Sequence, residues 1–177
     1  MNTLETMTRR KSVRSYTGEQ ISDEELEKIL KAGYSAPVGR GLYENVHITI
    51  ITNKDLLNEI NENAAKVTGE PNLKMLYGAP MLVLVSVKFQ PPSSENATYS
   101  NAACIIENMA LEAVELGIGS CHIWGAIGML GGRPDIVSKL ELPEGFVPVS
   151  GIILGKTEET YDVREIPDNK IARNYIK

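Results

Sequence analysis

Residues 99–124 have the sequence YSNAACIIENMALEAVELGIGSCHIW. Apolar side chains recur at helical spacing over residues 99–116, and their face is wider than that of an ordinary surface helix. Gly117 suits the position after a helix, because glycine adopts a left-handed backbone without strain. Residues 120–124 then favour a strand. We therefore expect residues 99–116 to form either the central buried helix of the fold or part of a subunit interface.

Helical and extended patterns alternate through the rest of the chain. Ser22, followed three residues later by Glu25, predicts a capping box at the start of a helix that Pro37 ends. Residues 81–87 are continuously apolar, as expected of a strand covered on both faces. The other expected elements are a short first helix around Leu4 and Met7, strands over 46–51 and 146–154, helices over 53–67 and 135–140, a helical turn over 72–77, a loop over 90–95 and an extended arm over 161–177. This order predicts one α+β domain, residues 1–177, with more helices than strands.

The N-terminal segment concentrates positive charge in an acidic chain. The sequence has 18 Lys and Arg against 23 Asp and Glu, and four of the 18 are Arg9, Arg10, Lys11 and Arg14. Without these four the count is 14 against 23, a formal charge of −9. Together with the Ser12 hydroxyl, forked guanidinium donors and an ammonium suit a phosphate group. The cluster therefore indicates a phosphorylated cofactor or substrate.

Two alternative roles for the basic segment stay open, a solvated tail and an arm that binds nucleic acid. The sequence pI of about 5.2 and the lack of a second basic patch count against nucleic acid, whose long backbone needs a larger positive surface. No apolar run approaches the ~20 residues that cross a bilayer, and the first residues lack the apolar stretch of a signal peptide. We therefore expect a cytoplasmic protein without nucleic-acid or membrane partners.

Motifs for several common chemistries are missing from the sequence. It contains no glycine-rich dinucleotide fingerprint and no Walker loop. The only histidines are His47 and His122, which we expect to be ordinary strand residues. The only cysteines are Cys104 and Cys121, which we expect to be buried, reduced and without a metal. A phosphate-binding cluster without a recognisable general base indicates that a cofactor carries the reaction.

Five segments carry a further pattern, and they occur in one order. They are RKSVRSY at 10–16, SAPVG at 35–39, KMLYGAP at 74–80, ELGIGSC at 115–121, and ILG at 153–155 followed by Arg164. In this order they resemble the FMN-dependent nitroreductase family over essentially the whole chain. The resemblance implies a nitroreductase-like α+β fold with a central mixed, mostly antiparallel sheet flanked by helices. It also implies an intertwined homodimer with exchanged C-terminal arms and FMN at each subunit interface.

The resemblance assigns residues to the parts of the flavin. Arg10, Ser12 and Arg164 would hold the phosphate and the ribityl chain, and Lys11 would lie beside them. The remaining assignments are Arg14 and Lys74 at the N1 and C2 carbonyl region, Asn72 at the pyrimidine, Ile123, Trp124 and Gly125 near N5, and Pro37, Val38 and Gly39 from the partner subunit against the ring. No catalytic side chain and no metal is implied, because the flavin N5 carries the chemistry.

The resemblance also implies an activity. It is that of an FMN-dependent NAD(P)H oxidoreductase, in which NADH or NADPH reduces the flavin and a flat electrophilic acceptor, such as a nitroaromatic or a quinone, then takes the electrons by a ping-pong mechanism. The alternative is a flavin-binding protein without turnover, for storage or regulation. It is motivated by Val38 and Gly39, which replace two serines of the family's loop.

Three single residues remain to be assigned. A lone tryptophan after an apolar strand is more often a core residue than a stacking platform, so both roles stay open for Trp124. We expect Arg9 to be the solvated member of the basic segment. Arg40 could contact the phosphate of a nicotinamide dinucleotide, but we favour a solvated loop charge.

Overall fold

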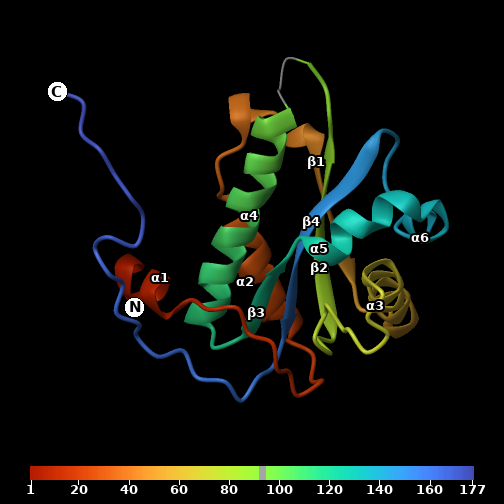
Figure 1. Ribbon diagram of the computed structural model, residues 1–177, viewed down its shortest axis with the longest axis horizontal. Helices are drawn as coiled ribbons and strands as arrows, with labels where there is room; N and C mark the ends of the chain where they lie inside the picture. The colour runs from red at the N-terminus through yellow and green to blue at the C-terminus, as the bar shows by residue number, and fades with distance from the viewer. Residues whose placement is uncertain (92–94) are drawn as a thin grey trace.

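The computed structural model describes residues 1–91 and 95–177, which are built around a four-stranded sheet (Figure 1). The strand order is β1 (Val46–Ile51), β2 (Met81–Lys88), β4 (Phe146–Gly155) and β3 (Gly119–Ile123). All three strand pairings are antiparallel. The sheet predicted as mixed and mostly antiparallel thus has no parallel pairing among the described residues. β1 and β3 form its two edges.

Helices cover both faces of this sheet. One face packs against α2 (Asp23–Tyr34) and α4 (Glu95–Glu115), and the other against α3 (Lys54–Thr68), α5 (Gly125–Gly128) and α6 (Pro134–Ser138). Alternate residues of β2 enter the two cores: Val83 and Val85 face α2 and α4, whereas Leu82 and Leu84 face the other side. The continuous apolar run of β2 is therefore explained by burial on both faces, as predicted.

The long helix α4 is the central helix that its wide apolar face predicts. Ile106, Met109 and Ala113 are fully buried. Gly117 has φ +70°, and the Ile118 amide donates to the Ala113 carbonyl at 2.8 Å, which closes the end of the helix. The prediction of two buried thiols was half wrong: Cys121 is buried, but Cys104 is exposed on α4.

The helix starts follow the capping signals. The Ser22 hydroxyl accepts a hydrogen bond from the Glu25 amide, and the Glu25 carboxylate accepts from the Ser22 amide at 2.8 Å. Asn53 caps α3 through two backbone amides. A short helix, α1 (Thr3–Arg9), ends at the first residue of the basic segment, as expected. The 3₁₀ turns η1 (Gly39–Gly41), η2 (Tyr43–Asn45) and η3 (Met129–Gly132) complete the helical elements that the structure describes.

One predicted element was wrong and one falls partly outside the described chain. Residues 72–77 form successive turns and not a helical turn, because Tyr77 and Gly78 take positive φ values of 50° and 78° that interrupt a helix. The loop expected over residues 90–95 includes 92–94, which lie outside the described residues.

Both ends of the chain run along the same side of the molecule (Figure 1). Residues 161–177 contain no helix or strand and leave the body of the molecule, as predicted for an extended arm. Several apolar side chains of the arm face solvent, with Ile171 81% and Ile176 93% exposed. None of the helices that the structure describes is long and apolar enough to span a membrane.

Candidate functional site

The basic segment lies along the outer edge of β3. The Val13 amide donates a hydrogen bond to the Ser120 carbonyl at 2.8 Å, and the Tyr16 hydroxyl donates to the Val13 carbonyl at 2.9 Å. The Tyr16 ring packs against Gly119 and Gly155, where an added Cβ would lie 3.0 Å from ring carbons. The two glycines and the edge hydrogen bond thus fix the segment against the sheet.

Two cations of this segment are paired with carboxylates and remain accessible. Arg10 Nε lies 3.2 Å from Glu107 on α4, and Lys11 Nζ lies 2.8 Å from Glu159. The Arg10 side chain is 36% exposed and that of Lys11 32%. Within the described parts of the chain, Nη1 and Nη2 of Arg10 have no hydrogen-bond partner. Arg10 can therefore keep its ion pair and still donate to a bound anion.

Ser12 and Arg14 flank Val13, which pairs with the edge of β3, and Arg14 also contacts a neighbouring turn. Burial raises the pKa of the Cys121 thiol on β3, and the Ser12 hydroxyl and the charges of Arg14 and Arg10 oppose that rise. The Arg14 guanidinium lies over the Tyr77 ring, 5.6 Å from its centroid. Contact with Tyr77 also raises the pKa of Arg14. Arg14 thereby joins the basic segment to the turn that carries Lys74.

The same turn reaches the end of β3. Met75 packs on Gly125, because a Cβ added to that glycine would lie 3.6 Å from the Met75 sulfur. Trp124 is 67% exposed, so the core role considered for it is wrong. Ile123 is only 6% exposed and faces the core, so only its backbone is available to a ligand. The structure thus brings the basic segment, the Met75 turn and the end of β3 together.

Two predicted site residues lie on the outer part of that turn. Lys74 and Asn72 are both exposed. Lys74 also lines a hollow of about 620 Å³ between α3 and the turn, together with Pro71 and Leu73. No hydrogen bond or ion pair among the described residues joins Asn72 or Lys74 to the basic segment.

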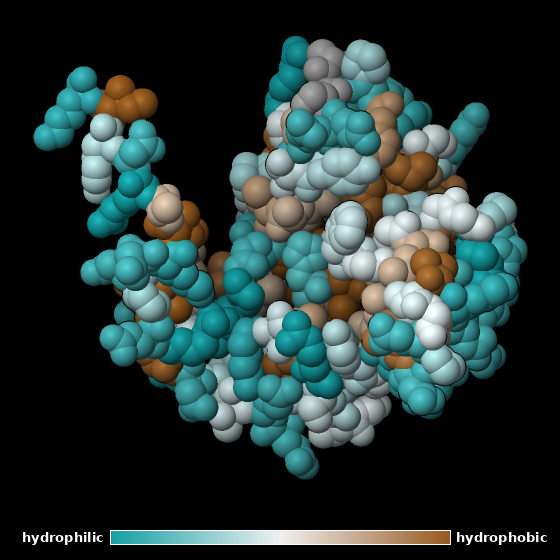
Figure 2. All heavy atoms as spheres, in the orientation of Figure 1, coloured by the Kyte–Doolittle hydropathy of each residue, from teal (hydrophilic) through white to brown (hydrophobic). Residues whose placement is uncertain are grey.

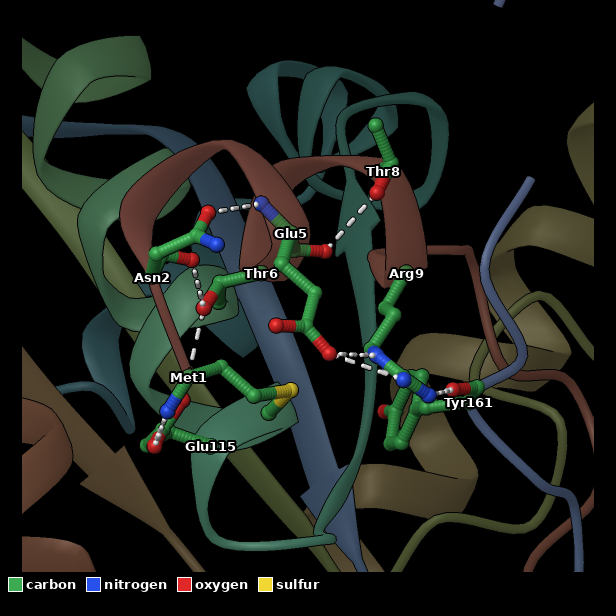
Figure 3. Close-up of polar contacts among 8 residues, drawn as sticks. All are labelled: Met1, Asn2, Glu5, Thr6, Thr8, Arg9, Glu115 and Tyr161. Carbon is green, nitrogen blue, oxygen red and sulfur yellow. Dashed lines mark hydrogen bonds and ion pairs between the residues drawn. The ribbon is translucent and has the colours of Figure 1, made fainter. Parts of the chain in front are cut away.

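Arg164 returns the end of the chain to the basic segment. Its Nε donates to the Thr8 carbonyl at 2.9 Å, and its Nη2 donates to the Arg10 carbonyl. Arg9 makes a second connection, donating to the Tyr161 carbonyl at 2.7 Å and to the Glu5 carboxylate at 2.8 Å (Figure 3). The expectation that Arg9 is solvated was wrong, because its donors anchor the C-terminal segment.

The loop of Pro37, Val38 and Gly39 lies in another part of the fold, beside α2 and α4. Val38 is buried against the core that α2 and α4 share, and the Gly39 amide donates to Asn101 on α4 at 2.9 Å. Among the described residues, no hydrogen bond or ion pair joins this loop to the basic segment. Within one chain, as far as the structure describes it, no polar interaction therefore links the loop to the basic segment, and its role from a partner subunit stays what the family resemblance implies.

His122 on β3 also belongs to the surroundings of the basic segment, although the sequence did not identify it as a site residue. Its Nε2 lies 2.7 Å from the Ser150 hydroxyl. Burial lowers the pKa of His122, and of the nearby charges Glu107 raises it and Arg10 lowers it, so the ring shares the surroundings of the Arg10–Glu107 pair. The sequence also did not identify Tyr77, whose ring lies beneath Arg14, as a site residue. The strand position of His122 was predicted, but nothing in the sequence places α4 and its Glu107 beside that strand.

The described residues contain no group of three or more His, Cys, Asp or Glu side chains arranged to hold a metal ion. What the site offers instead is a set of cationic and hydroxyl donors at one end and an exposed aromatic ring with a small residue, Trp124 and Gly125, at the other. Such a set can bind an anionic group and a flat ring that lies along β3.

Comparisons with known proteins agree on one family. A family model described as Nitroreductase family matches residues 7–156. A protein of Archaeoglobus fulgidus named "Putative NADH dehydrogenase/NAD(P)H nitroreductase" is 30% identical over 164 residues, which are 90% of this chain and 87% of that protein. The crystal structure of a Bacteroides fragilis nitroreductase with bound FMN is 30% identical with a TM-score of 0.81, covering 99% of this chain and 100% of the other. A nitroreductase with bound FMN from Desulfitobacterium hafniense is 25% identical with a TM-score of 0.83, covering 100% of each chain.

Proposed function

We propose, because the chain belongs to the nitroreductase family and has its fold, that it is an FMN-dependent oxidoreductase acting as one domain over residues 1–177. NADH or NADPH donates two electrons, and a flat electrophilic acceptor such as a nitroaromatic or a quinone takes them in a second half-reaction. The observation that carries the proposal is the convergence of phosphate-suited donors and an exposed aromatic edge on one strand, β3.

The residues present fit FMN at both ends. Among the residues that the structure describes, the two Nη atoms of Arg10 have no partner, and Ser12, Lys11 and Arg164 adjoin Arg10, so a phosphate there would receive charge-assisted hydrogen bonds. Arg14 is exposed above Tyr77, where a cation would stabilise negative charge on a reduced ring. Asn72 and Lys74 would approach the pyrimidine from the neighbouring turn. When bound, FMN supplies hydride transfer at N5.

The backbone at the end of β3 would orient the ring. Ile123 and Gly125 offer main-chain groups, and Gly125 brings no side chain that would separate the ring from the strand. Trp124 would flank the N5 edge with an aromatic surface.

The proposal includes a homodimer. Pro37, Val38 and Gly39 would reach the ring only from a partner subunit, and the arm over 161–177 would lie on that subunit. Two features support this: no hydrogen bond or ion pair joins the loop to its own basic segment among the described residues, and the arm exposes apolar side chains that a second copy would cover. Val38 is buried and would contribute mainly through its backbone, whereas the Pro37 ring is exposed and could contact the flavin directly.

Sequential anaerobic mixing tests the activity. Protein loaded with FMN and freed of excess cofactor is mixed with NADH or NADPH, and a nitroaromatic or a quinone is added afterwards. We expect the flavin colour to bleach with the nicotinamide and to return with the acceptor. Retained flavin that neither nucleotide bleaches would favour the storage role, and protein that retains no flavin would contradict both.

A further inference from the structure

An uncharged groove continues from the end of β3. It has a volume of about 630 Å³ and lies between α5, η3, α6 and the start of β4. Trp124 and Gly125 form its end nearest the proposed ring site, while Ile127, Val137 and Val147 line its length. Figure 2 shows pale and brown atoms gathered over α5 and α6 on the face toward the viewer. The groove is large enough for a ligand much larger than a single six-membered ring.

The charge around this groove differs from that of the phosphate end. Among the residues that the structure describes, those that line it are all uncharged. At its rim the Tyr99 hydroxyl lies 3.5 Å from the Glu95 carboxylate, a charge that would repel an anion. The cations Arg10, Lys11 and Arg14 belong to the basic segment and do not line the groove. An anionic ligand therefore loses hydration here without gaining a partner, whereas an uncharged apolar one gains burial.

Apolar side chains of the groove are unusually exposed. Trp124 is 67%, Tyr99 42% and Val147 41% exposed. A contiguous, concave patch of exposed apolar side chains marks a binding site more often than a surface without function. Its continuity with Trp124 and Gly125 places any occupant next to the proposed flavin edge.

We infer that this groove binds the apolar substituent of an uncharged, flat acceptor, such as an alkyl-substituted quinone, whose ring lies at Trp124. The inference rests on the proposed function and specifies its acceptor: free flavins and other anionic acceptors are disfavoured. In the overall reaction the quinone gains a hydride and a proton and becomes the hydroquinone. NADH or NADPH supplies the hydride and becomes NAD⁺ or NADP⁺, and solvent supplies the proton.

The single tryptophan of the chain makes a binding test independent of turnover. Because Trp124 lines the groove, saturable quenching of its fluorescence reports occupancy in the protein as purified, without nicotinamide. The probes are 1,4-benzoquinones with methyl, butyl or octyl substituents and the octyl analogue ending in a carboxylate. We expect Kd to fall by up to about fourfold for each methylene buried, and the carboxylate to weaken binding at least about tenfold relative to octyl.

Two valine variants locate the effect. Val147→Asp places a charge in the groove and should flatten the dependence of Kd on chain length. Val67→Asp, at a 59% exposed valine of α3 outside the groove, should keep the wild-type dependence. A Kd independent of chain length in the wild-type protein, or an equal dependence in both variants, would overturn the inference.

Sedimentation of the same variants tests whether a second copy of the chain covers the groove instead. In that case Val147→Asp would convert a dimer to a monomer and the alkyl series would show no trend, which would also overturn the inference. Loss of NAD(P)H oxidation with an intact chain-length trend would contradict the proposed function and leave the groove assignment standing. Flavin turnover without any trend would do the reverse.

Discussion

At the scale of single residues, the side chains of the basic segment divide into structural and ligand-binding donors. Arg9 donates hydrogen bonds to the Glu5 carboxylate and the Tyr161 carbonyl. Arg10 donates only through Nε, to Glu107, within the described chain. The two neighbouring arginines carry the same charge but differ in the donors that they leave available. Affinity for a phosphate should therefore depend on one and not on the other.

Arg10→Ala and Ser12→Ala should each weaken FMN binding. Each removes a charge-assisted hydrogen bond worth about 1.5–3 kcal/mol, which corresponds to roughly a ten- to hundredfold rise in Kd. Fluorescence titration of FMN into the flavin-free protein measures it. Arg9→Ala is the matched control and should leave Kd within about threefold of the wild type. Unchanged affinity in both Arg10→Ala and Ser12→Ala would contradict the phosphate assignment.

The His122 ring should make stability depend on acidity. Its pKa lies below the ordinary value of 6.5 because the ring is partly buried, which disfavours its charged form, although the residue as a whole is exposed. A lowered pKa in the folded state means that the stabilisation is complete above the ordinary value and is lost as pH falls through the folded value. Tm should therefore fall more steeply between about pH 7 and pH 5 in the wild type than in His122→Gln. Parallel Tm profiles for the two proteins would refute this role, and His47→Gln on β1 serves as the matched histidine control.

Residue-level expectations from sequence succeeded where pattern alone decides and failed where neighbours decide. Cys121 points to a covered face of its strand and is buried, but Cys104 lies on an exposed part of the α4 surface. Trp124 follows an apolar strand, yet the strand ends before it and the ring is exposed. Whether a side chain at an element's edge is covered depends on packing partners distant in sequence.

At the scale of elements, the edge of β3 positions the site through glycines. Gly119 and Gly155 are paired across β3 and β4, and the Tyr16 ring lies against both. Side chains at these positions would displace Tyr16, whose hydroxyl holds the Val13 carbonyl. The register between the basic segment and β3 therefore depends on the absence of two methyl groups.

Gly155→Ala should destabilise the fold and disturb the site. Its new methyl group would lie 2.6 Å from Pro80 Cδ and 3.0 Å from Tyr16 Cδ1, both in rigid rings. Overpacking of this kind costs about 1–3 kcal/mol, and denaturant unfolding measures it. Gly128→Ala is the matched control, since no atom in the described parts of the chain lies within 4 Å of the added methyl group and the φ of −59° suits any residue. That variant should be neutral or up to about 1 kcal/mol more stable. Equal stability of the two variants would show that Pro80 and Tyr16 do not pack tightly against Gly155.

Most elements were predictable because caps and periodicity are local. The strand over 46–51 has the predicted bounds, and the capping residues Ser22 and Asn53 begin α2 and α3. The turns over 72–77 were not predictable, because Tyr77 adopts positive φ in a setting where Arg14 lies over its ring. That setting is created by a segment about sixty residues away and leaves no local signal.

At the scale of the whole molecule, the C-terminal arm is the part that one chain does not explain. Arg164 fixes its base on Thr8 and Arg10, but the residues beyond have their apolar side chains in solvent. Ile171, Tyr175 and Ile176 are each more than three quarters exposed. The pattern indicated an arm without helical period, but the sequence alone does not specify the surface that the arm covers.

Removal of residues 166–177 should weaken self-association while leaving the fold intact. The truncation keeps Arg164 and the base of the arm, and it deletes the exposed apolar side chains that a second copy would bury. We expect the dimer dissociation constant to rise at least about tenfold, as measured by sedimentation equilibrium, with little change in the far-ultraviolet circular dichroism spectrum. Unaltered association after truncation would show that the arm contributes nothing to a dimer.

Flavin binding at the basic segment is tested most sharply by the visible absorption spectrum after reconstitution. The protein is incubated with FMN, passed through a desalting column and measured beside Arg10→Ala treated identically. We predict that the wild type retains the two visible bands of oxidised flavin in a ratio near one FMN per chain, and that Arg10→Ala retains much less. A wild-type spectrum without flavin bands would contradict the assignment of this chain as an FMN-dependent oxidoreductase.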